Sequence, residues 1–307
     1  MKIVQIGLGS WGENLTKILS EFGVLSAIFD PDFNKCKEIA KKYSINYYNS
    51  EEDLISLEDF DGALVGNNSS SQIAENLLYK KKHIFLDKAS KWDSIEVQKL
   101  KELSEKNKVI LTWGLDERFS SSIENLKQSL RQKKFGDAIM LELYRQNSLC
   151  QENGGIIFES AINDMDIANV LFDEFPVVVF ARFGYSKNEN ENEIFVSMML
   201  GYKNNKTVVI LSNGTLQEKI KKLQLFCTGA ILQLDLNTEK IKISNQKHLE
   251  IIEKRDTLKF QVKNFIDSIE GKSKVLLNPN DMINLTKIVE GALLSGKQGV
   301  PIYLDLK

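Results

Sequence analysis

The chain has 307 residues, of which 42% are hydrophobic and 27% are charged. This length is sufficient for two domains with substantial cores. Its 40 Lys and Arg residues against 42 Asp and Glu residues give a formal charge of −2, so no overall field favours nucleic acid or an anionic membrane surface as a partner.

Cysteine and histidine usage argues against a metal site. Cys36, Cys150 and Cys227 are far apart, and the chain has only two histidines. We expect a reducing compartment, and no apolar run approaches the roughly 18 residues of a membrane span. A strand that begins at residue 2 leaves no room for a signal peptide, so the sequence predicts a cytoplasmic protein without a bound metal.

The first third of the chain alternates between strand-like and helix-like segments. We expect strands at 2–7, 25–30, 45–48, 62–66, 83–88 and 109–114, and helices at 11–22, 33–43, 51–57, 70–81 and 94–107. Because parallel strands need a crossover that a helix supplies, this alternation predicts a doubly wound parallel sheet. It is typical of a Rossmann domain.

The pattern changes near residue 118. After helices at 120–133 and 154–172 and a strand at 137–147, we expect strands at 177–186, 194–202, 206–214, 222–236 and 240–244. Helices at about 256–270 and 280–295 are expected to cover one face of this sheet. The sequence therefore predicts an α/β Rossmann domain at 1–117. An α+β domain with a large, mostly antiparallel open sheet follows at 118–307, with the closing segment free to pack back on the first domain.

Three glycines separate the first strand from the first helix. Gly7, Gly9 and Gly12 form the spacing GxGxxG, in which the first glycine permits a tight turn. The second lets the backbone approach a pyrophosphate, and the third lets the helix pack closely on the strand. The backbone of Leu8, Ser10 and Trp11, together with the helix N-terminus, is expected to hold the phosphates of a dinucleotide.

Asp30 ends the second predicted strand, 18 residues after Gly12. Such a carboxylate accepts hydrogen bonds from ribose hydroxyls and repels a 2′-phosphate, so we favour NAD over NADP. Alternatively, Asp30 only begins an Asp-Pro turn.

Lys88 follows a predicted parallel strand at the sheet edge where ligands bind in this architecture. Partial desolvation and a nearby cationic nicotinamide would lower the pKa of its amine toward the range useful for proton transfer. Alternatively, a lysine at this place is a solvated side chain.

Polar residues form a stripe on the helix predicted at 154–172. Glu159, Asn163 and Asp166 are spaced i, i+4 and i+7, which places them on one face. The other sides of this helix are apolar, so we expect it to be buried with this edge facing a cleft. The alternative is the solvated side of an ordinary helix.

Together these segments resemble the Gfo/Idh/MocA oxidoreductases, a family that includes glucose-fructose oxidoreductase and inositol dehydrogenase. "GLGSWG", "HIFLDKAS", "LDERFSSSI", "GGIIFESAINDMD" and "LLSGKQGVPI" are similar to its motifs along nearly the whole chain. The resemblance implies NAD(P)-dependent hydride transfer at a secondary alcohol carbon of a sugar, polyol or nucleotide sugar. It also implies a homodimer or homotetramer formed through the C-terminal sheet.

The resemblance also implies individual residue roles. Asn67 and Asn68 would line the nicotinamide side of the cofactor, and Asp87 and Lys88 would fill the family's Glu-Lys positions. Arg118 is expected near the cofactor or at the domain junction.

For catalysis we expect Lys88 to take the hydroxyl proton and Asn163 to orient the hydroxyl. Glu159 and Asp166 are expected to contact the substrate with them, and Tyr144 and Arg145 are further candidates for substrate contact.

The chain departs from the family at several motif positions. Asn163 stands where the family has its catalytic histidine, and Glu159 replaces the preceding Asp. An amide cannot shuttle a proton, so a dinucleotide-binding sensor or partner subunit without turnover is an alternative function. A third hypothesis is that the cofactor serves transient oxidation during glycoside or ring cleavage.

Overall fold

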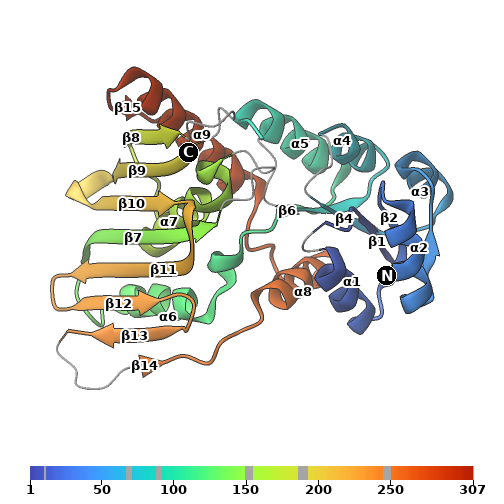
Figure 1. Ribbon diagram of the computed structural model, residues 1–307, viewed down its shortest axis with the longest axis horizontal. Helices are drawn as coiled ribbons and strands as arrows, with labels where there is room; N and C mark the ends of the chain where they lie inside the picture. Colours follow the sequence, from blue (N-terminus) through green and yellow to red (C-terminus); the bar gives the residue numbers. More distant parts are fainter. Residues whose placement is uncertain are drawn as a thin grey trace. The chain divides into compact units, whose positions relative to one another are not determined.

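The structure of the protein is a computed structural model (Figure 1). It describes residues 1–9, 12–66, 71–87, 92–148, 155–185, 193–244 and 250–306. The chain forms two compact units, each made of two stretches: Met1–Leu115 with Leu258–Met282, and Asp116–Thr257 with Ile283–Lys307. The chain therefore leaves the first unit after Leu115 and returns to it at Leu258. The sequence analysis expected domains at 1–117 and 118–307 and so placed this returning stretch in the second domain, whereas the structure places it in the first unit.

A six-stranded parallel sheet with the order β3-β2-β1-β4-β5-β6 forms the centre of the first unit. Its strands are β1 (Ile3–Ile6), β2 (Leu25–Phe29), β3 (Asn46–Tyr47), β4 (Gly62–Val65), β5 (His83–Leu86) and β6 (Leu111–Trp113). This order and the crossover helices confirm the doubly wound Rossmann topology predicted from the sequence.

Five crossover helices connect the strands, and capping side chains mark where three of them begin. They are α1 (Gly12–Glu21), α2 (Phe33–Tyr43), α3 (Glu51–Leu57), α4 (Ser71–Tyr79) and α5 (Ser94–Asn107). Asp32 caps α2 by accepting a hydrogen bond from the Lys35 amide, and Asp93 and Glu96 form a capping box on α5. These side chains satisfy amide groups that have no partner within the helix, which fixes where each helix begins.

A helix from late in the chain completes the core of the first unit. Val262, Phe265 and Ile266 of α8 (Thr257–Ile269) pack in one cluster with residues of β1, α1, β4 and β5. The Phe265 ring meets the Phe85 ring edge-on, with centroids 5.9 Å apart. The expectation that this helix covers the second sheet is wrong, because an apolar helix face does not reveal which sheet it will cover.

The second unit contains a nine-stranded sheet with the order β14-β13-β12-β11-β7-β10-β9-β8-β15. Its strands are β7 (Ala138–Ser148), β8 (Val178–Tyr185), β9 (Glu193–Gly201), β10 (Thr207–Asn213), β11 (Thr215–Cys227), β12 (Ile231–Asp235), β13 (Lys240–Ile243), β14 (Glu250–Ile251) and β15 (Ile302–Tyr303). All neighbouring strands run antiparallel except β7 and β10, which are parallel. The predicted large, mostly antiparallel sheet is confirmed.

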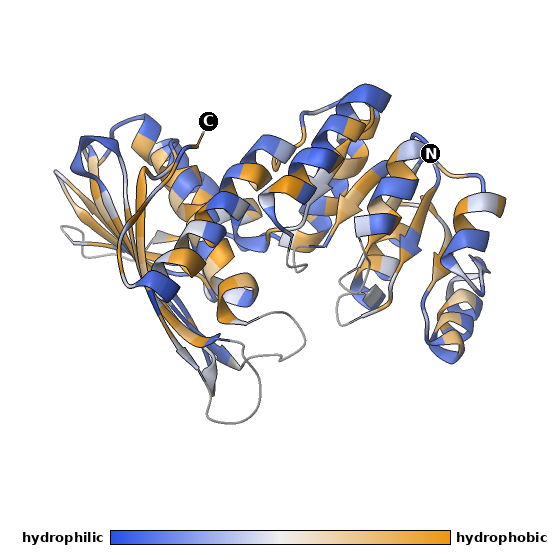
Figure 2. Ribbon diagram, turned by 90° about the horizontal axis from the view of Figure 1, so that it is seen from above, coloured by the Kyte–Doolittle hydropathy of each residue, from blue (hydrophilic) through white to orange (hydrophobic). Residues whose placement is uncertain are grey.

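Helical segments cover one face of this sheet. They are η1 (Asp116–Phe119), α6 (Ser121–Arg131), η3 (Ile157–Ala161), α7 (Ile162–Phe172) and α9 (Pro279–Gln298), and a short turn η4 (Lys203–Asn205) joins β9 to β10. Helix α7 packs on β7 and β10, and Ser295 of α9 accepts a hydrogen bond from the Ala181 amide of β8. In Figure 2 the helices carry both colours, as expected for helices with one buried face, and the strands of the nine-stranded sheet also show both, since one face of that sheet is open.

The closing segment belongs to the second unit. Ile302 and Tyr303 form β15, which pairs antiparallel with β8 at one edge of the nine-stranded sheet. The sequence analysis left open that this segment packs on the first domain, whereas the structure assigns it to the second unit. Among the described residues, no helix combines the length and apolar character that crossing a bilayer requires.

Candidate active site

The glycine turn after β1 has the shape that a dinucleotide needs. Gly7 has φ +93°, and a Cβ added there would lie 3.4 Å from the Cα of Gly66. A Cβ on Gly12 would lie 3.3 Å from the Gly7 oxygen and from the Leu8 Cβ, so the start of α1 needs this glycine for packing. Apart from its chain neighbours, no atom of the described residues would lie within 4 Å of a Cβ on Gly9. The open side of Gly9 therefore fits the approach of a pyrophosphate, and Ser10 and Trp11 lie outside the described residues.

Two buried polar side chains, Gln5 and Thr16, hold this turn in place. The sequence analysis missed both. The amide of Gln5 donates to the Gly12 oxygen at 2.8 Å and to the Gly7 oxygen at 3.1 Å. Thr16 of α1 donates to the Gln5 Oε1 at 2.8 Å. Both side chains are at most 1% exposed, so buried hydrogen bonds hold the backbone of Gly7 and Gly12 at the two ends of the turn. A glutamine inside the apolar run "IVQI" was the signal available in the sequence.

Asp30 ties the end of β2 to the glycine turn. Its Oδ2 accepts a hydrogen bond from the Leu8 amide at 2.5 Å, and its Oδ1 accepts one from the Asp32 amide at 2.8 Å. The bond from the Asp32 amide forms the Asp-Pro turn that the sequence analysis gave as the alternative. The bond from the Leu8 amide brings the carboxylate to the glycine turn that is predicted to hold the phosphates. Lys35 donates to the Leu8 oxygen, so a cation also lies at this turn. Each carboxylate oxygen retains a second lone pair for a ribose hydroxyl.

The remaining cofactor candidates follow β4 and β5, which are paired in parallel. Asp87 continues the ladder by donating its amide to the Val65 oxygen at 2.9 Å, and its side chain is half-buried. Asn67, Asn68 and Lys88 lie outside the described residues, so their predicted roles stay predictions. Across the ranges that the structure does describe, no group of three or more His, Cys, Asp or Glu side chains is placed to hold a metal ion.

The polar helix of the second unit begins with a π-helical turn. The amide of Ile162 donates to the Ile157 oxygen five residues earlier, and the regular helix α7 follows. Asn163, Asp164 and Asp166 are each at most 2% exposed, whereas Glu159 is half-buried. The predicted stripe is thus mostly internal, and only Glu159 reaches solvent from it.

Arg118 and Asp166, which the sequence analysis assigned to cofactor and substrate, form an ion pair in which Asp166 is buried and Arg118 is half-buried. The Nε of Arg118 donates to both carboxylate oxygens of Asp166, at 2.8 Å and 3.1 Å, and Nη2 donates to Oδ1. Their side chains are 11% and 2% exposed. Such a two-pronged contact joins η1 to α7 and holds both side chains in fixed positions.

Arg145 lies at the centre of a second buried charge cluster. Its Nη1 donates to Glu117 Oε1 at 2.7 Å, and its Nε and Nη2 donate to Asp164. Lys221 also donates to Glu117, at 2.6 Å. Burial alone would lower the pKa of Arg145, but the two carboxylates raise it above its ordinary value, so the guanidinium stays charged. These contacts do not support the expected role of Arg145 in substrate binding.

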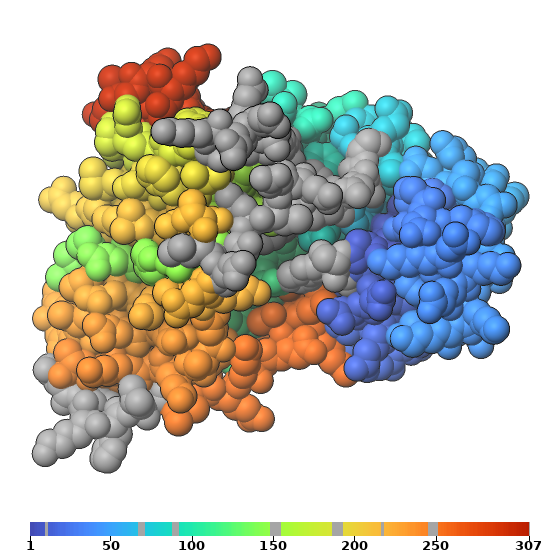
Figure 3. All heavy atoms as spheres, in the orientation of Figure 1, coloured from blue at the N-terminus to red at the C-terminus, as the bar shows by residue number. Residues whose placement is uncertain are grey.

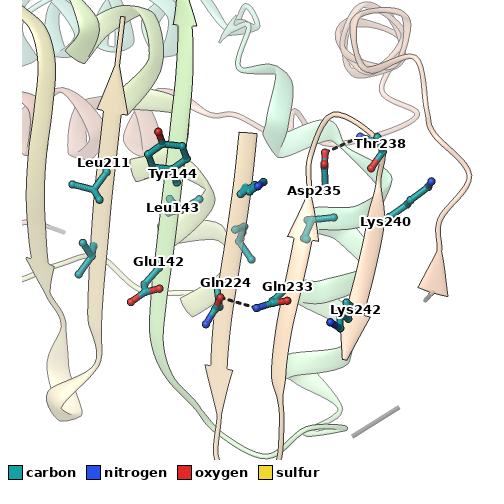
Figure 4. A pocket seen from close by; sticks show the side chains of 14 residues that line it. Glu142, Leu143, Tyr144, Leu211, Gln224, Gln233, Asp235, Thr238, Lys240 and Lys242 are labelled. Carbon is teal, nitrogen blue, oxygen red and sulfur yellow. Dashed lines mark hydrogen bonds between the residues drawn. The ribbon is translucent and has the colours of Figure 1, made fainter. Parts of the chain in front are cut away.

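Tyr144 points away from this cluster because neighbouring residues of a strand face opposite sides of the sheet. Leu141, Leu143 and Arg145 are buried beneath the helices, while Glu142 and Tyr144 lie on the open face. There Tyr144 lines a hollow of about 630 Å³ formed by β7 and β10–β13 (Figure 4). The strand therefore places Tyr144 on the opposite side of the sheet from α7, where it cannot share a site with Asn163.

The missed residues in this unit are Glu117 and Asp164. Glu117 is 7% exposed and Asp164 is 1% exposed. Burial raises the pKa of the Asp164 carboxyl, although the charge of Arg145 opposes this rise. The alternation of Leu141, Leu143 and Arg145 was the available signal, because it predicts an arginine on the buried face that needs carboxylate partners.

Comparison with known proteins agrees with this geometry. Residues 1–115 match the model of the Gfo/Idh/MocA oxidoreductase family, described as an NAD-binding Rossmann fold. The chain is 28% identical over 194 residues to myo-inositol 2-dehydrogenase from Thermotoga maritima. This alignment covers 59% of the chain and 58% of the relative, so it spans under two thirds of that protein.

Solved structures share the fold along almost the whole chain. An oxidoreductase from Agrobacterium radiobacter in complex with NAD⁺, L-tartaric acid and magnesium has a TM-score of 0.89 at 14% identity, covering 99% of this chain and 98% of that one. The WlbA dehydrogenase from Chromobacterium violaceum, in complex with NADH and UDP-GlcNAcA, has a TM-score of 0.87 at 15% identity, covering 100% and 96%.

The glycine turn, the strand order and the matched family model all concern the same residues. They confirm the expectation of an NAD-binding domain and the resemblance that the sequence motifs indicated. The part of the chain that forms the Rossmann domain thus matches the NAD-binding domain of the Gfo/Idh/MocA oxidoreductase family.

Proposed function

We propose that this protein is an NAD-dependent oxidoreductase that transfers hydride between nicotinamide and a secondary alcohol carbon. The similarity to myo-inositol 2-dehydrogenase carries this proposal and makes a polyol or sugar the first substrate class to test. Nucleotide sugars follow, because a dehydrogenase of the same fold is known in complex with UDP-GlcNAcA. The wide spacing of the three cysteines supports a reducing compartment, and we propose the cytoplasm.

The first unit would hold the cofactor. Gly9 leaves space for the pyrophosphate, and Asp30 would accept hydrogen bonds from the adenosine ribose. A 2′-phosphate would meet the Asp30 carboxylate, which favours NAD over NADP. When bound, the nicotinamide supplies the hydride acceptor, and the protein supplies position and electrostatics.

The remaining roles concern the hydroxyl group of the substrate. Lys88 would act on its proton and Asn163 would orient it, with Glu159 beside them. The Arg118–Asp166 pair supports Asn163 indirectly, because it anchors the helix that carries this amide. Asp87, Asn67 and Asn68 remain proposed contacts on the nicotinamide side.

Spectrophotometric assay of a substrate panel tests this function. Myo-inositol, common sugars and nucleotide sugars are offered with NAD or NADP, and NADH formation is followed. We expect turnover with NAD, and Lys88→Met should lower it at least about 10²-fold while nearly preserving NAD affinity. Unchanged turnover in Lys88→Met would remove this lysine from the mechanism.

A binding protein without turnover is the second candidate, because Asn163 replaces the family's histidine. It predicts NAD binding in calorimetry without NADH formation from any compound of the panel. Activity on a single compound would end this alternative.

We also propose that two copies pair through the open face of the nine-stranded sheet. The strands of this sheet form the yellow, green and orange surface in Figure 3. Leu211, Tyr144 and Met199 are 42%, 38% and 49% exposed on the open face. The hollow on this face is lined by charged residues of both signs, among them Glu142, Asp235, Lys222 and Lys240. A twofold axis would bring Lys222 and Lys240 of one copy toward acidic residues of the other.

Light scattering should give a dimer or tetramer mass, and Leu211→Glu should reduce it. A monomeric wild-type protein at high concentration would contradict this pairing.

A further inference from the structure

A polar side chain lies inside the first strand of the parallel sheet. Gln5 is the third residue of β1, and the other three residues of this strand are apolar and buried. A buried amide without hydrogen-bond partners would cost free energy, so an interior glutamine is tolerated only when its polar atoms are satisfied. The partners of Gln5 therefore indicate what this side chain does in the domain.

The amide nitrogen of Gln5 braces the two ends of the glycine turn. Its Nε2 donates to the Gly12 oxygen at 2.8 Å and to the Gly7 oxygen at 3.1 Å, which uses both of its hydrogens. The nitrogen lies directly against the turn, since a Cβ added to Gly12 would be 3.4 Å from it. Because the amide group is planar and its two hydrogens have a fixed spacing, it holds these two carbonyl groups at a fixed separation.

Thr16 of α1 orients this amide. Its Oγ1 lies 2.8 Å from the Gln5 Oε1 and 2.7 Å from the Gly12 oxygen, so its single proton is shared between two acceptors. The carbonyl oxygens of the turn can only accept, and the hydroxyl donates on the other side of the amide. The network is therefore satisfied only when Nε2 faces the turn and Oε1 faces Thr16.

The row of hydrogen bonds continues from the turn to Asp30. The Gly7 oxygen that accepts from Gln5 belongs to the same peptide group as the Leu8 amide, and this amide donates to the Asp30 Oδ2 at 2.5 Å. Hydrogen bonds in such a row polarise and strengthen one another. Removal of the Gln5 amide should therefore weaken the hold on the Asp30 carboxylate as well as on the glycine turn.

We propose that Gln5, oriented by Thr16, is a positioning residue for the adenosine diphosphate half of NAD. It fixes both the turn that takes the pyrophosphate and the Asp30 carboxylate that takes the ribose. This inference rests on the proposed placement of NAD on Gly9 and Asp30. Gln5 and Thr16 are buried, so they touch no ligand and act through the backbone of the first unit.

Substitution of the two buried side chains tests this role through NAD affinity. Gln5→Met keeps the length of the side chain without its donors, and we expect the dissociation constant of NAD to rise at least about tenfold in calorimetry. Thr16→Val removes only the orienting hydroxyl and should raise it about threefold.

Thr112→Val is the matched control for these variants. Thr112 is also buried in the first unit and donates to a backbone carbonyl, the Leu277 oxygen, at 2.8 Å. This substitution should lower the melting temperature but leave the dissociation constant of NAD within about twofold of the wild-type value. Loss of a buried hydrogen bond is thereby separated from loss of cofactor positioning.

A double-mutant cycle with Asp30→Asn provides a readout that a merely structural role would not move. Asp30→Asn removes the charge but keeps an oxygen for the Leu8 amide. Because part of the effect of Gln5 passes through Asp30, the rise in the dissociation constant caused by Gln5→Met should be at least about threefold smaller in the Asp30→Asn background. Thr112→Val should have the same effect in both backgrounds.

The outcomes separate this inference from the proposed function. The role of Gln5 is refuted if Gln5→Met binds NAD within about twofold of the wild-type protein, or if its effect is equal in both backgrounds. Turnover by the wild-type protein would still support the oxidoreductase function in either case. If the wild-type protein binds NAD but oxidises nothing in the panel, the oxidoreductase function fails and the affinities still decide the role of Gln5. Should Gln5→Met not fold, unchanged affinity in Thr16→Val refutes the inference and weakened affinity supports it.

Discussion

At the scale of single residues, Gly9 differs from the other two glycines of its turn. Gly7 and Gly12 are needed by the protein itself, through a positive φ and through close packing. At Gly9, the described part of the chain leaves space where a side chain would project. Its requirement for glycine should therefore come from the ligand and not from the fold.

We predict that Gly9→Val raises the dissociation constant of NAD at least about tenfold, because the side chain fills the space for the pyrophosphate. The melting temperature should change little, since no atom of the described residues beyond its chain neighbours lies within 4 Å of the added Cβ. Gly12→Val should instead lower the melting temperature, because its Cβ meets the Gly7 oxygen. Calorimetric titration with NAD and thermal unfolding measure the two effects. Equal losses of stability in both variants would contradict this distinction.

His83 provides a pH-dependent contribution to stability. Burial lowers the pKa of His83 from its ordinary value, Lys82 adds to this effect and Asp61 opposes it. Its Nδ1 accepts a hydrogen bond from the Ile110 amide at 2.9 Å, which requires the neutral ring. Because the pKa of the folded state lies below that of the unfolded state, this contribution is present above the unfolded pKa. It is lost as pH falls through the folded pKa.

We therefore predict that the melting temperature of the wild-type protein falls more than that of His83→Gln when the pH is lowered from about 7.5 to about 5.5. The amide oxygen of the glutamine accepts a hydrogen bond at any pH. Thermal unfolding of both proteins at the two pH values checks this. An equal shift in both would show that His83 does not titrate on unfolding in this range.

At the scale of elements, η1 is fastened to its surroundings by two consecutive residues. Glu117 bonds to Arg145 of β7, which in turn holds Asp164 of α7. Arg118 bonds to Asp166, two residues further along α7. The two ion pairs act on the same helix, so they determine the position of Asn163 although neither includes it.

We predict that Arg118→Ala lowers the free energy of unfolding by about 3–5 kcal/mol, because it leaves the buried Asp166 carboxylate without a countercharge. The double variant Arg118→Met with Asp166→Leu should recover most of this loss. Asp137→Asn removes one member of the exposed Lys133–Asp137 pair, whose side chains are 73% and 71% exposed, and should change stability little. Urea unfolding of the four proteins tests this, and a double variant no more stable than Arg118→Ala would contradict it.

The sequence predicted the positions of the helices and strands better than the contacts between them. Alternation of strand and helix gave the parallel sheet, because each βαβ unit encodes its own crossover. The buried ion pairs were not predicted, because Arg145 joins Glu117 and Asp164 across segments that are distant in sequence. Tyr144 and Arg145 were assigned to one site, although the two-residue period of a strand places them on opposite faces. Applying that period to "LELYR" would have separated them.

At the scale of the whole molecule, the first unit is built from two separated stretches. Phe265 is fully buried against Phe85, Ile3 and Leu64, which all belong to the first 115 residues. The sequence could not reveal this, since an amphipathic helix after a run of strands fits either sheet. The NAD-binding domain therefore depends on residues that the family model does not cover.

We predict that a fragment of Met1–Leu115 does not unfold cooperatively and binds NAD weakly, because it exposes the apolar surface that α8 covers. Linking Leu258–Met282 to it should restore a cooperative urea transition, and Phe265→Ala in the linked form should weaken it by about 3–5 kcal/mol. Cooperative unfolding of the short fragment alone would refute this dependence.

The return of the chain at Leu258 also sets the order of events during translation. At about 5–20 residues per second, on the order of 10 s pass between synthesis of β6 and synthesis of α8. During that time the nascent Rossmann sheet presents to the cell the bare apolar groove that Phe265 will later fill. Chaperones that bind nascent chains thus have a defined interval, and a defined surface, on which to act.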